Sequence, residues 1–211
     1  MLTIAMVLRS GGDYTPEYVR RLCEGIRQHT RSRHRVVCLS DDPAVSQYCE
    51  HEPLVTDWTG WWSKLELFRV FKGSTLYLDL DTLVVGDITP ITEYPHYFTM
   101  LSDLLFPVRP ASGVMAWSGD FSYLADGFDM SQAEDYRKTE CWGDQGWITK
   151  QLGFDPARFQ DLFPGMIVSR KRSTDDQKRA ASIICYHGKP RPHQTGWDTG
   201  IGAPQRVGRR A

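Results

Sequence analysis

The start of the chain alternates between apolar and amphipathic segments, and this alternation most limits the folds open to it. Leu2–Leu8 is a short apolar run that predicts a strand, and a glycine-rich loop follows it. A helix is predicted from Thr15, with Pro16 at its first position, because apolar residues then recur every three or four positions. Arg35–Ser40 predicts a second strand. Strand, helix and strand in this order indicate a parallel sheet and the α/β class.

The rest of the chain continues this pattern within one domain. Trp61–Phe71 predicts a helix closed by Gly73, and Thr75–Asp87 predicts a buried strand. No linker interrupts residues 1–190, so we expect one domain there and a tail (191–211) rich in Pro, Gly and Arg. Further strands are predicted at Tyr97–Asp103, Ser112–Ser118, Met166–Ser169 and Ser182–His187, and further helices at Asp120–Phe128 and Asp144–Leu152.

Composition and charge exclude several functions. The formal net charge of −1 over 211 residues supplies no field that would attract nucleic acid, so no nucleic-acid partner is expected. No run approaches roughly 18 apolar residues, and Met1–Leu8 is too short for a signal peptide. No transmembrane segment is therefore predicted, while a peripheral membrane contact stays open. The five cysteines form no CxxC pair and are expected to be reduced, which predicts a cytoplasmic protein.

Two aspartates interrupt the apolar run TLYLDLDTLVVGD. In a strand, Asp79 and Asp81 would project to the same side, roughly 6–7 Å apart. Two negative charges at that separation repel by on the order of 2–3 kcal/mol at an effective dielectric of roughly 20, so a positive partner is expected beside them. That partner is either one or two Arg or Lys side chains, or a divalent cation such as Mg²⁺ or Mn²⁺ that is shared with a phosphate-bearing ligand.

A DxD pair at the end of a strand is used by two classes of enzyme. One is the haloacid-dehalogenase-like phosphohydrolases, in which Asp79 would be the nucleophile and Asp81 the acid. That motif normally lies on the first strand of its domain, whereas here strands and a helix precede it. The later acidic pair, Asp175–Asp176, follows a basic run rather than an apolar strand. The other class is the metal-dependent nucleotide-sugar transferases, and the remaining motifs favour it.

The order of these motifs resembles the family-eight glycosyltransferases, the glycogenin and bacterial galactosyltransferase group. The motifs are RSGGDY, SKLELFRVF, LYLDLDTLVVGDI, SGVMAW, DQGW and HGKP, and they extend from about Met1 to Pro190. The resemblance implies a GT-A fold, a Rossmann-like domain with a mostly parallel central sheet flanked by helices. It also implies a hexosyltransferase that moves a sugar from a UDP-sugar, with retention, to an acceptor hydroxyl. The acceptor stays open among a glycan, a lipid-linked saccharide and a protein, and a non-catalytic nucleotide-sugar-binding module stays open as well.

The same resemblance assigns roles to particular residues. It implies a Mn²⁺ or Mg²⁺ ion held by Asp79, Asp81 and His187. It places Asp144 and Gln145 near the reacting carbon of the sugar. The donor is expected to contact Leu8, Arg9, Asp13, Tyr14, Lys64, Asp79, Asp103, Ser112, Gly113, Gly188 and Lys189.

Plainer explanations of several of these residues stay open. The chain also departs from the family pattern at Ala111, where an asparagine is usual, and at Arg191, which follows the HGKP box where a tryptophan is common. The open alternatives are packing at a helix start for Tyr14, snorkelling to solvent for Lys64, a surface turn for His187 and a helix cap for Asp144.

Overall fold

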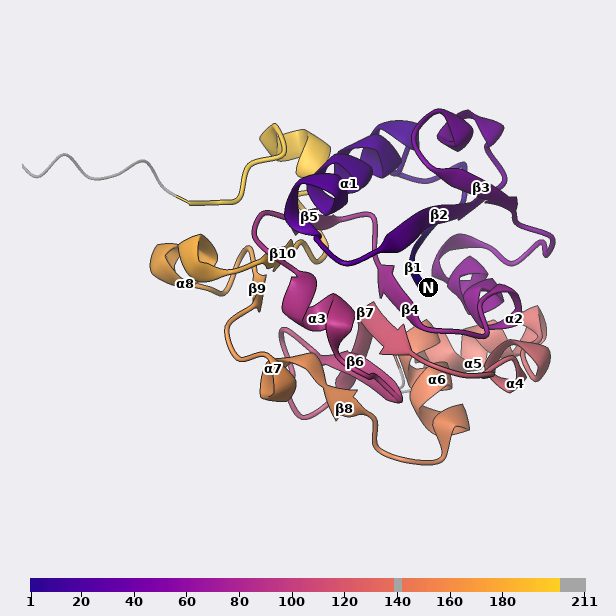
Figure 1. Cartoon of the computed structure of the whole chain (residues 1–211). Helices are drawn as coiled ribbons and strands as arrows, with labels where there is room; N and C mark the ends of the chain where they lie inside the picture. Colours follow the sequence, from indigo (N-terminus) through magenta and orange to yellow (C-terminus); the bar gives the residue numbers. More distant parts are fainter. Residues whose placement is uncertain (139–141, 202–211) are drawn as a thin grey trace, which may run out of the picture.

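The main sheet extends on both sides of β1 (Leu2–Leu8), the first strand of the chain. The computed structural model describes residues 1–138 and 142–201 (Figure 1). In it, β1 pairs in parallel with β2 (His34–Ser40) and with β4 (Thr75–Leu78). The seven strands lie in the order β3-β2-β1-β4-β7-β6-β8, and only the β4–β7 and β6–β7 pairs are antiparallel among those described. The other four strands of this sheet are β3 (Glu50–Pro53), β7 (Pro110–Trp117), β6 (Phe98–Ser102) and β8 (Ala157–Arg158).

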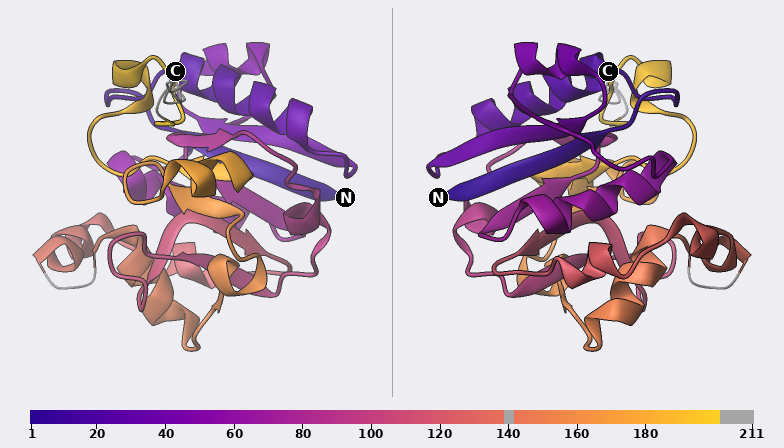
Figure 2. Two further views of the ribbon diagram at one scale, coloured as in Figure 1. Left: turned by 90° about the vertical axis from the view of Figure 1, so that its left-hand side faces the viewer. Right: turned by 90° about the vertical axis from the view of Figure 1, so that its right-hand side faces the viewer.

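Helices cover both faces of this sheet. Along β1, Ile4, Met6 and Leu8 face the cluster that includes α1, whereas Ala5 faces the cluster that includes α2, α4 and α6. Figure 2 shows α1 (indigo) and the yellow C-terminal segment at one end of the molecule, with the salmon helices α4–α6 at the other. The helices are α1 (Pro16–His29), α2 (Leu67–Val70), α3 (Thr89–Glu93), α4 (Tyr123–Asp126), α5 (Ala133–Lys138), α6 (Asp144–Leu152), α7 (Phe159–Leu162) and α8 (Asp175–Ala180), with 3₁₀ turns η1 (Pro43–Gln47), η2 (Gly60–Glu66), η3 (Met130–Gln132) and η4 (Pro192–Thr195).

The run TLYLDLDTLVVGD forms two strands rather than the single strand predicted. β4 ends at Leu78, and β5 (Thr82–Val84) belongs to a second, three-stranded sheet with β10 (Ile183–Cys185) and β9 (Ile167–Ser169). The two aspartates lie in the turn between these sheets, where the Thr82 N–H donates to the Asp79 carbonyl (3.1 Å). The prediction that both project from one strand is therefore wrong, because the chain leaves the main sheet directly after Leu78.

Most other predicted elements are confirmed, with one clear difference. Trp61–Phe71 is a 3₁₀ segment (η2) followed by the short α2, rather than a continuous α-helix. The buried carboxylate of Glu66 accepts hydrogen bonds from the backbone N–H groups of Val55 (2.9 Å) and Thr56 (3.1 Å). These hydrogen bonds to the preceding loop, rather than helix propensity, determine the backbone conformation of residues 61–71.

The described part of the predicted tail packs against α1. Trp197 lies edge-on to Tyr18 with ring centroids 4.5 Å apart, and His193 also contacts Tyr18. Residues 202–211 lie outside the described part of the chain, as does Cys141. Cys23, Cys38 and Cys185 are buried, free thiols.

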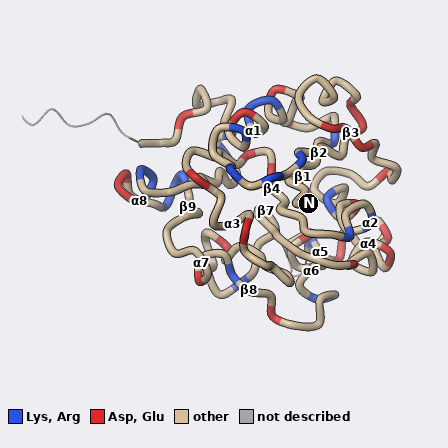
Figure 3. Tube along the Cα trace, in the orientation of Figure 1, with Lys and Arg blue, Asp and Glu red and all other residues tan. Residues whose placement is uncertain are grey.

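Charges of both signs are interspersed along the chain. Figure 3 shows this on α8, which carries Asp175 and Asp176 in its first turn and Lys178 and Arg179 in its last. Within residues 1–138 and 142–201, no helix has the length and apolar character needed to cross a membrane.

Candidate functional site

Two adjoining cavities lie where the main sheet presents the carboxyl ends of β1 and β4, the usual ligand position in α/β sheets. They share two lining residues, Trp61 and Asp79. Cavity A, of about 680 Å³, is lined by Arg9, Gly11, Gly12, Asp13, Tyr14, Lys64, Asp79 and Arg191 among others. Cavity B, of about 520 Å³, is lined by Asp79, Asp81, Asp103, Gly113, Asp144, Gln145, His187 and Gly188 among others. The fold thus brings most of the predicted site residues to one pair of cavities.

The ammonium of Lys64 lies between the carboxylates of two predicted site residues, Asp79 and Asp144. Its ammonium lies 2.9 Å from Asp144 Oδ2 and 3.1 Å from Asp79 Oδ1, and it is only 5% exposed. Ser112, also buried, donates a hydrogen bond of 2.6 Å from Oγ to Asp144 Oδ2. The alternative of a snorkelling Lys64 is therefore excluded. The Asp144 side chain binds these groups rather than capping α6, whose N-cap is Gly143.

Asp81 is paired with protein groups that come from distant parts of the chain. Its Oδ2 accepts hydrogen bonds from Tyr14 Oη and Arg191 Nη1, both at 2.9 Å. The Arg191 guanidinium also lies 5.0 Å from the centre of the Tyr14 ring and 3.3 Å from Asp13 Oδ2. Burial, together with the nearby charge of Asp79, raises the pKa of Asp81 to about 6. Arg191 therefore supplies the positive partner that Asp81 was expected to need.

Asp79 receives its second partner from β4, the strand that precedes it. The Tyr77 hydroxyl donates to Asp79 Oδ1, and burial and this neighbouring carboxylate raise the pKa of Tyr77. The side chain of Asp79 is 34% exposed at the junction of the cavities, and burial by the surrounding protein raises its pKa. The sequence analysis did not single out Tyr77, which lies on β4 one residue before its end.

His187 reaches cavity B from the second sheet. Its Nε2 lies 2.7 Å from Ser169 Oγ, and burial and the charge of Lys171 lower its pKa. The adjacent Tyr186 N–H donates to the Asp81 carbonyl (2.9 Å), which ties the end of β10 to the aspartate turn. Across residues 1–138 and 142–201, no three His, Cys, Asp or Glu side chains are grouped as metal ligands. Asp79, Asp81 and His187 nevertheless all line cavity B, and their role as metal ligands stays a prediction.

Three further predicted residues line cavity B. Asp103 Oδ1 accepts hydrogen bonds from the backbone N–H groups that follow it, and its Oδ2 accepts one from Gln145 Nε2 (3.4 Å). Gly113 lies directly against Asp79, because a Cβ at this position would be 3.3 Å from Asp79 Oδ2. A side chain at position 113 would therefore narrow the junction of the two cavities.

Some of the other residues predicted to contact the donor do not line either cavity. The Leu8 side chain is buried in the core, and Lys189 is exposed and lines neither cavity. Gly188 lines cavity B with a φ of 67°, a conformation that favours glycine. Arg9 lines cavity A and is held by the Thr56 carbonyl (2.5 Å) and by Asp41 (3.4 Å).

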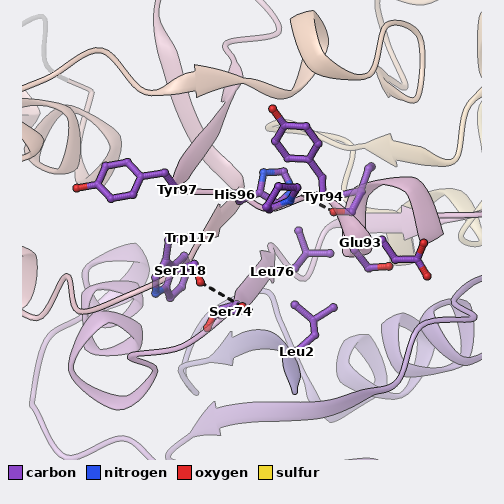
Figure 4. A pocket seen from close by; sticks show the side chains of 13 residues that line it. Leu2, Ser74, Leu76, Glu93, Tyr94, His96, Tyr97, Trp117 and Ser118 are labelled. Carbon is purple, nitrogen blue, oxygen red and sulfur yellow. Dashed lines mark hydrogen bonds between the residues drawn. The ribbon is translucent and has the colours of Figure 1, made fainter.

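Another cavity, of about 510 Å³, lies at the opposite edge of the sheet, where β1 and β4 begin (Figure 4). It contains none of the predicted site residues. Its buried histidine, His96, lies with Nδ1 2.8 Å from Thr99 Oγ1 and Nε2 3.0 Å from the Ile91 carbonyl. Both ring nitrogens of His96 thus have partners within the protein.

The phosphohydrolase alternative lacks its second acidic pair at the site. Asp175 and Asp176 begin α8, where they pair with Lys178 (3.4 Å) and Arg179 (2.9 Å). Neither aspartate lines cavity A or cavity B.

No family model and no curated protein matches this sequence. The structure nevertheless matches solved glycosyltransferases. The galactosyltransferase LgtC, in complex with donor and acceptor sugar analogues, matches with a TM-score of 0.63 and 13% identity over 93% of this chain and 92% of LgtC. GlyE from Streptococcus pneumoniae TIGR4 matches with a TM-score of 0.61 and 12% identity over 95% of this chain. The bifunctional glycosyltransferase WbbM matches with a TM-score of 0.58 and 10% identity over 90% of this chain.

These likenesses concern the fold. They confirm the predicted α/β fold of the GT-A type and the structural resemblance to the galactosyltransferase LgtC and the glycosyltransferase GlyE. The chain spans 60% of GlyE and 46% of WbbM.

Proposed function

From the fold of solved glycosyltransferases, we propose that this chain transfers a sugar from a UDP-sugar to an acceptor hydroxyl, in a metal-dependent reaction with retention. The observation that carries the proposal is the junction of cavities A and B at Asp79. The nucleoside would lie in cavity A, beside Arg9 and Tyr14. The sugar would lie in cavity B, beside Asp103 and Gln145. The diphosphate would then lie at the junction.

The chain's own cations support this placement of the diphosphate. Lys64 and Arg191 both line cavity A, and both are held in place by carboxylates. Fixed positive charge beside the bond that breaks stabilises the phosphate charge that develops as UDP leaves. Gly113 leaves room at the junction because a side chain there would contact Asp79.

The residues around the junction fit a divalent cation in their chemistry. Two carboxylates and an imidazole suit Mn²⁺, and Asp79, Asp81 and His187 all line cavity B. Burial and the nearby charge of Asp79 raise the pKa of Asp81, and a bound cation would favour the ionised form of both carboxylates. When bound, the ion supplies Lewis-acid neutralisation of the leaving diphosphate. Because Arg191 now pairs with Asp81, we propose that its guanidinium leaves Asp81 when the ion binds.

We propose that the acceptor attacks from the face that UDP leaves. Asp144 is poorly placed to act as a covalent nucleophile, because its Oδ2 is engaged by both Lys64 and Ser112. In the proposed step the acceptor oxygen bonds to the anomeric carbon while the bond to UDP breaks. The acceptor proton passes to the leaving phosphate oxygen. Asp144 and Gln145 would stabilise the positive charge that develops on the sugar.

UDP release from a panel of UDP-sugars, with Mn²⁺ or with EDTA, tests the proposal. We expect turnover only with metal, and its loss in Asp81→Asn with an unchanged circular dichroism spectrum. Asp87→Asn is the matched control, because this exposed aspartate ends the same segment and lines neither cavity. Wild-type turnover in Asp81→Asn would refute the proposal. Stabilisation by UDP and Mn²⁺ without UDP release from any donor would instead identify a binding module.

A further inference from the structure

The outer part of cavity B has an aromatic rim. Trp61 and Trp142 line the cavity and remain 50% and 48% exposed. The residue that follows Trp142, Gly143, packs on Trp61 so tightly that a Cβ there would be 2.8 Å from Trp61 Nε1. Large exposed indole rings beside a cavity provide flat surfaces on which the apolar face of a sugar can stack.

Two arginines lie on these aromatic rings. Arg137 lines cavity B with its guanidinium 5.4 Å from the Trp61 ring centre. The Arg109 guanidinium lies 5.3 Å from the ring centres of both Trp142 and Phe106. A guanidinium stacked on a ring keeps its N–H groups at the edge available for an anion. Within residues 1–138 and 142–201, neither arginine has a carboxylate partner, in contrast to Arg191.

We infer that the acceptor is an acidic saccharide, whose ring stacks on Trp61 and Trp142 and whose carboxylate or phosphate binds Arg109 and Arg137. This inference rests on the proposed transferase function. The inner wall of cavity B carries Asp79, Asp81, Asp103 and Asp144, so an anionic group is disfavoured there. Charge complementarity therefore orients the acceptor with its anionic group at the rim and its hydroxyl toward the donor.

The test compares matched neutral and anionic acceptors. After a donor is identified by UDP release, transfer is measured to methyl hexosides, to the corresponding methyl hexuronides and to methyl hexoside 6-phosphates. We expect kcat/KM to be at least about tenfold higher for an anionic member than for its neutral counterpart, the size of one charge-assisted contact. The uronide and phosphate series separate the two sources of the negative charge.

The double variant Arg109→Gln/Arg137→Gln should abolish this preference, so that kcat/KM becomes equal for the anionic and neutral members of each pair. Arg35→Gln is the matched control, since this guanidinium also lies over a ring, Phe71, at 5.9 Å, and lines neither cavity. Equal use of neutral and anionic acceptors, use of neither, or a preference retained in the double variant would overturn the inference. Donor hydrolysis in those cases would leave the proposed transferase standing, whereas no UDP release from any donor would refute the transferase itself.

Discussion

Replacing Lys64 by methionine removes the one cation that contacts both Asp79 and Asp144 among the described residues. The methionine retains most of the volume and none of the charge. Lys64 and Asp144 are almost fully buried, with side chains 6% and 9% exposed. The variant therefore leaves the Asp144 carboxylate in the interior with only Ser112 as a hydrogen-bond donor among the contacts described above.

The expected loss follows from this burial. Breaking a buried ion pair on one side costs about 3–5 kcal/mol, because the remaining charge is no longer compensated. The unpaired Asp79 contributes less to this loss of stability, because its side chain is 34% exposed and water can solvate it. Partial burial already raises the pKa of Asp79, and removal of the ammonium raises it further. Acid pH protonates such a carboxyl, so the loss of stability in the variant should be largest near neutral pH and smaller at pH 5.

Urea unfolding of wild type and Lys64→Met at pH 7.5 and pH 5, monitored by tryptophan fluorescence, measures this loss. The double variant Lys64→Met/Asp144→Asn should recover at least half of it, because the amide keeps a partner for Ser112 without the charge. A loss below about 1 kcal/mol at pH 7.5, the range of an exposed pair, would refute the reasoning. So would a loss that is the same at both pH values, or a double variant less stable than the single one.

Three further perturbations have expected outcomes. Gly113→Ala should lower kcat/KM for UDP-sugar turnover about tenfold through displacement of Asp79, with little change in Tm, whereas Gly73→Ala, where a Cβ meets nothing within 4 Å, should do neither. Arg191→Gln should tighten Mn²⁺ binding, measured by titration without nucleotide, because a competing cation leaves Asp81; weaker binding would contradict this. Burial lowers the pKa of His96, so the free energy of unfolding should fall as pH drops below about 6.5, by at most about 1.4 kcal/mol per pH unit, and His96→Gln should flatten that slope.

Local signals in the sequence determined much of the fold. Leu2–Leu8 was predicted with its observed bounds, and Pro16 begins α1 as expected, because apolar periodicity and helix starts are encoded within a few residues. The prediction of a single strand at Thr75–Asp87 was wrong because strand pairing is not a local property of the sequence. Its apolar residues continue after Asp81, but the partner strand changes from β1 to β10, and pairing partners lie far away in the sequence.

In the candidate site, too, some contacts were predicted from sequence motifs and others depend on long-range packing. The pair Asp79 and Asp81 and the distant His187 were predicted to share a site and do line one cavity. The contact of Arg191 with Asp81 was not predicted, because Arg191 falls in the tail, which shows no periodic pattern in the sequence. Its position depends on the packing of the C-terminal segment on α1, and that packing has no local periodic signature.

The second sheet has a consequence for motion. Its strands β5, β9 and β10 are three residues long, so few ladder hydrogen bonds hold the aspartate turn and His187 in register. Local opening of this sheet would release the Tyr186 amide from the Asp81 carbonyl while the seven-stranded sheet stays closed. Amide hydrogen exchange should therefore be faster in β10 than in β1. A ligand bound across the turn should slow exchange in β10 first.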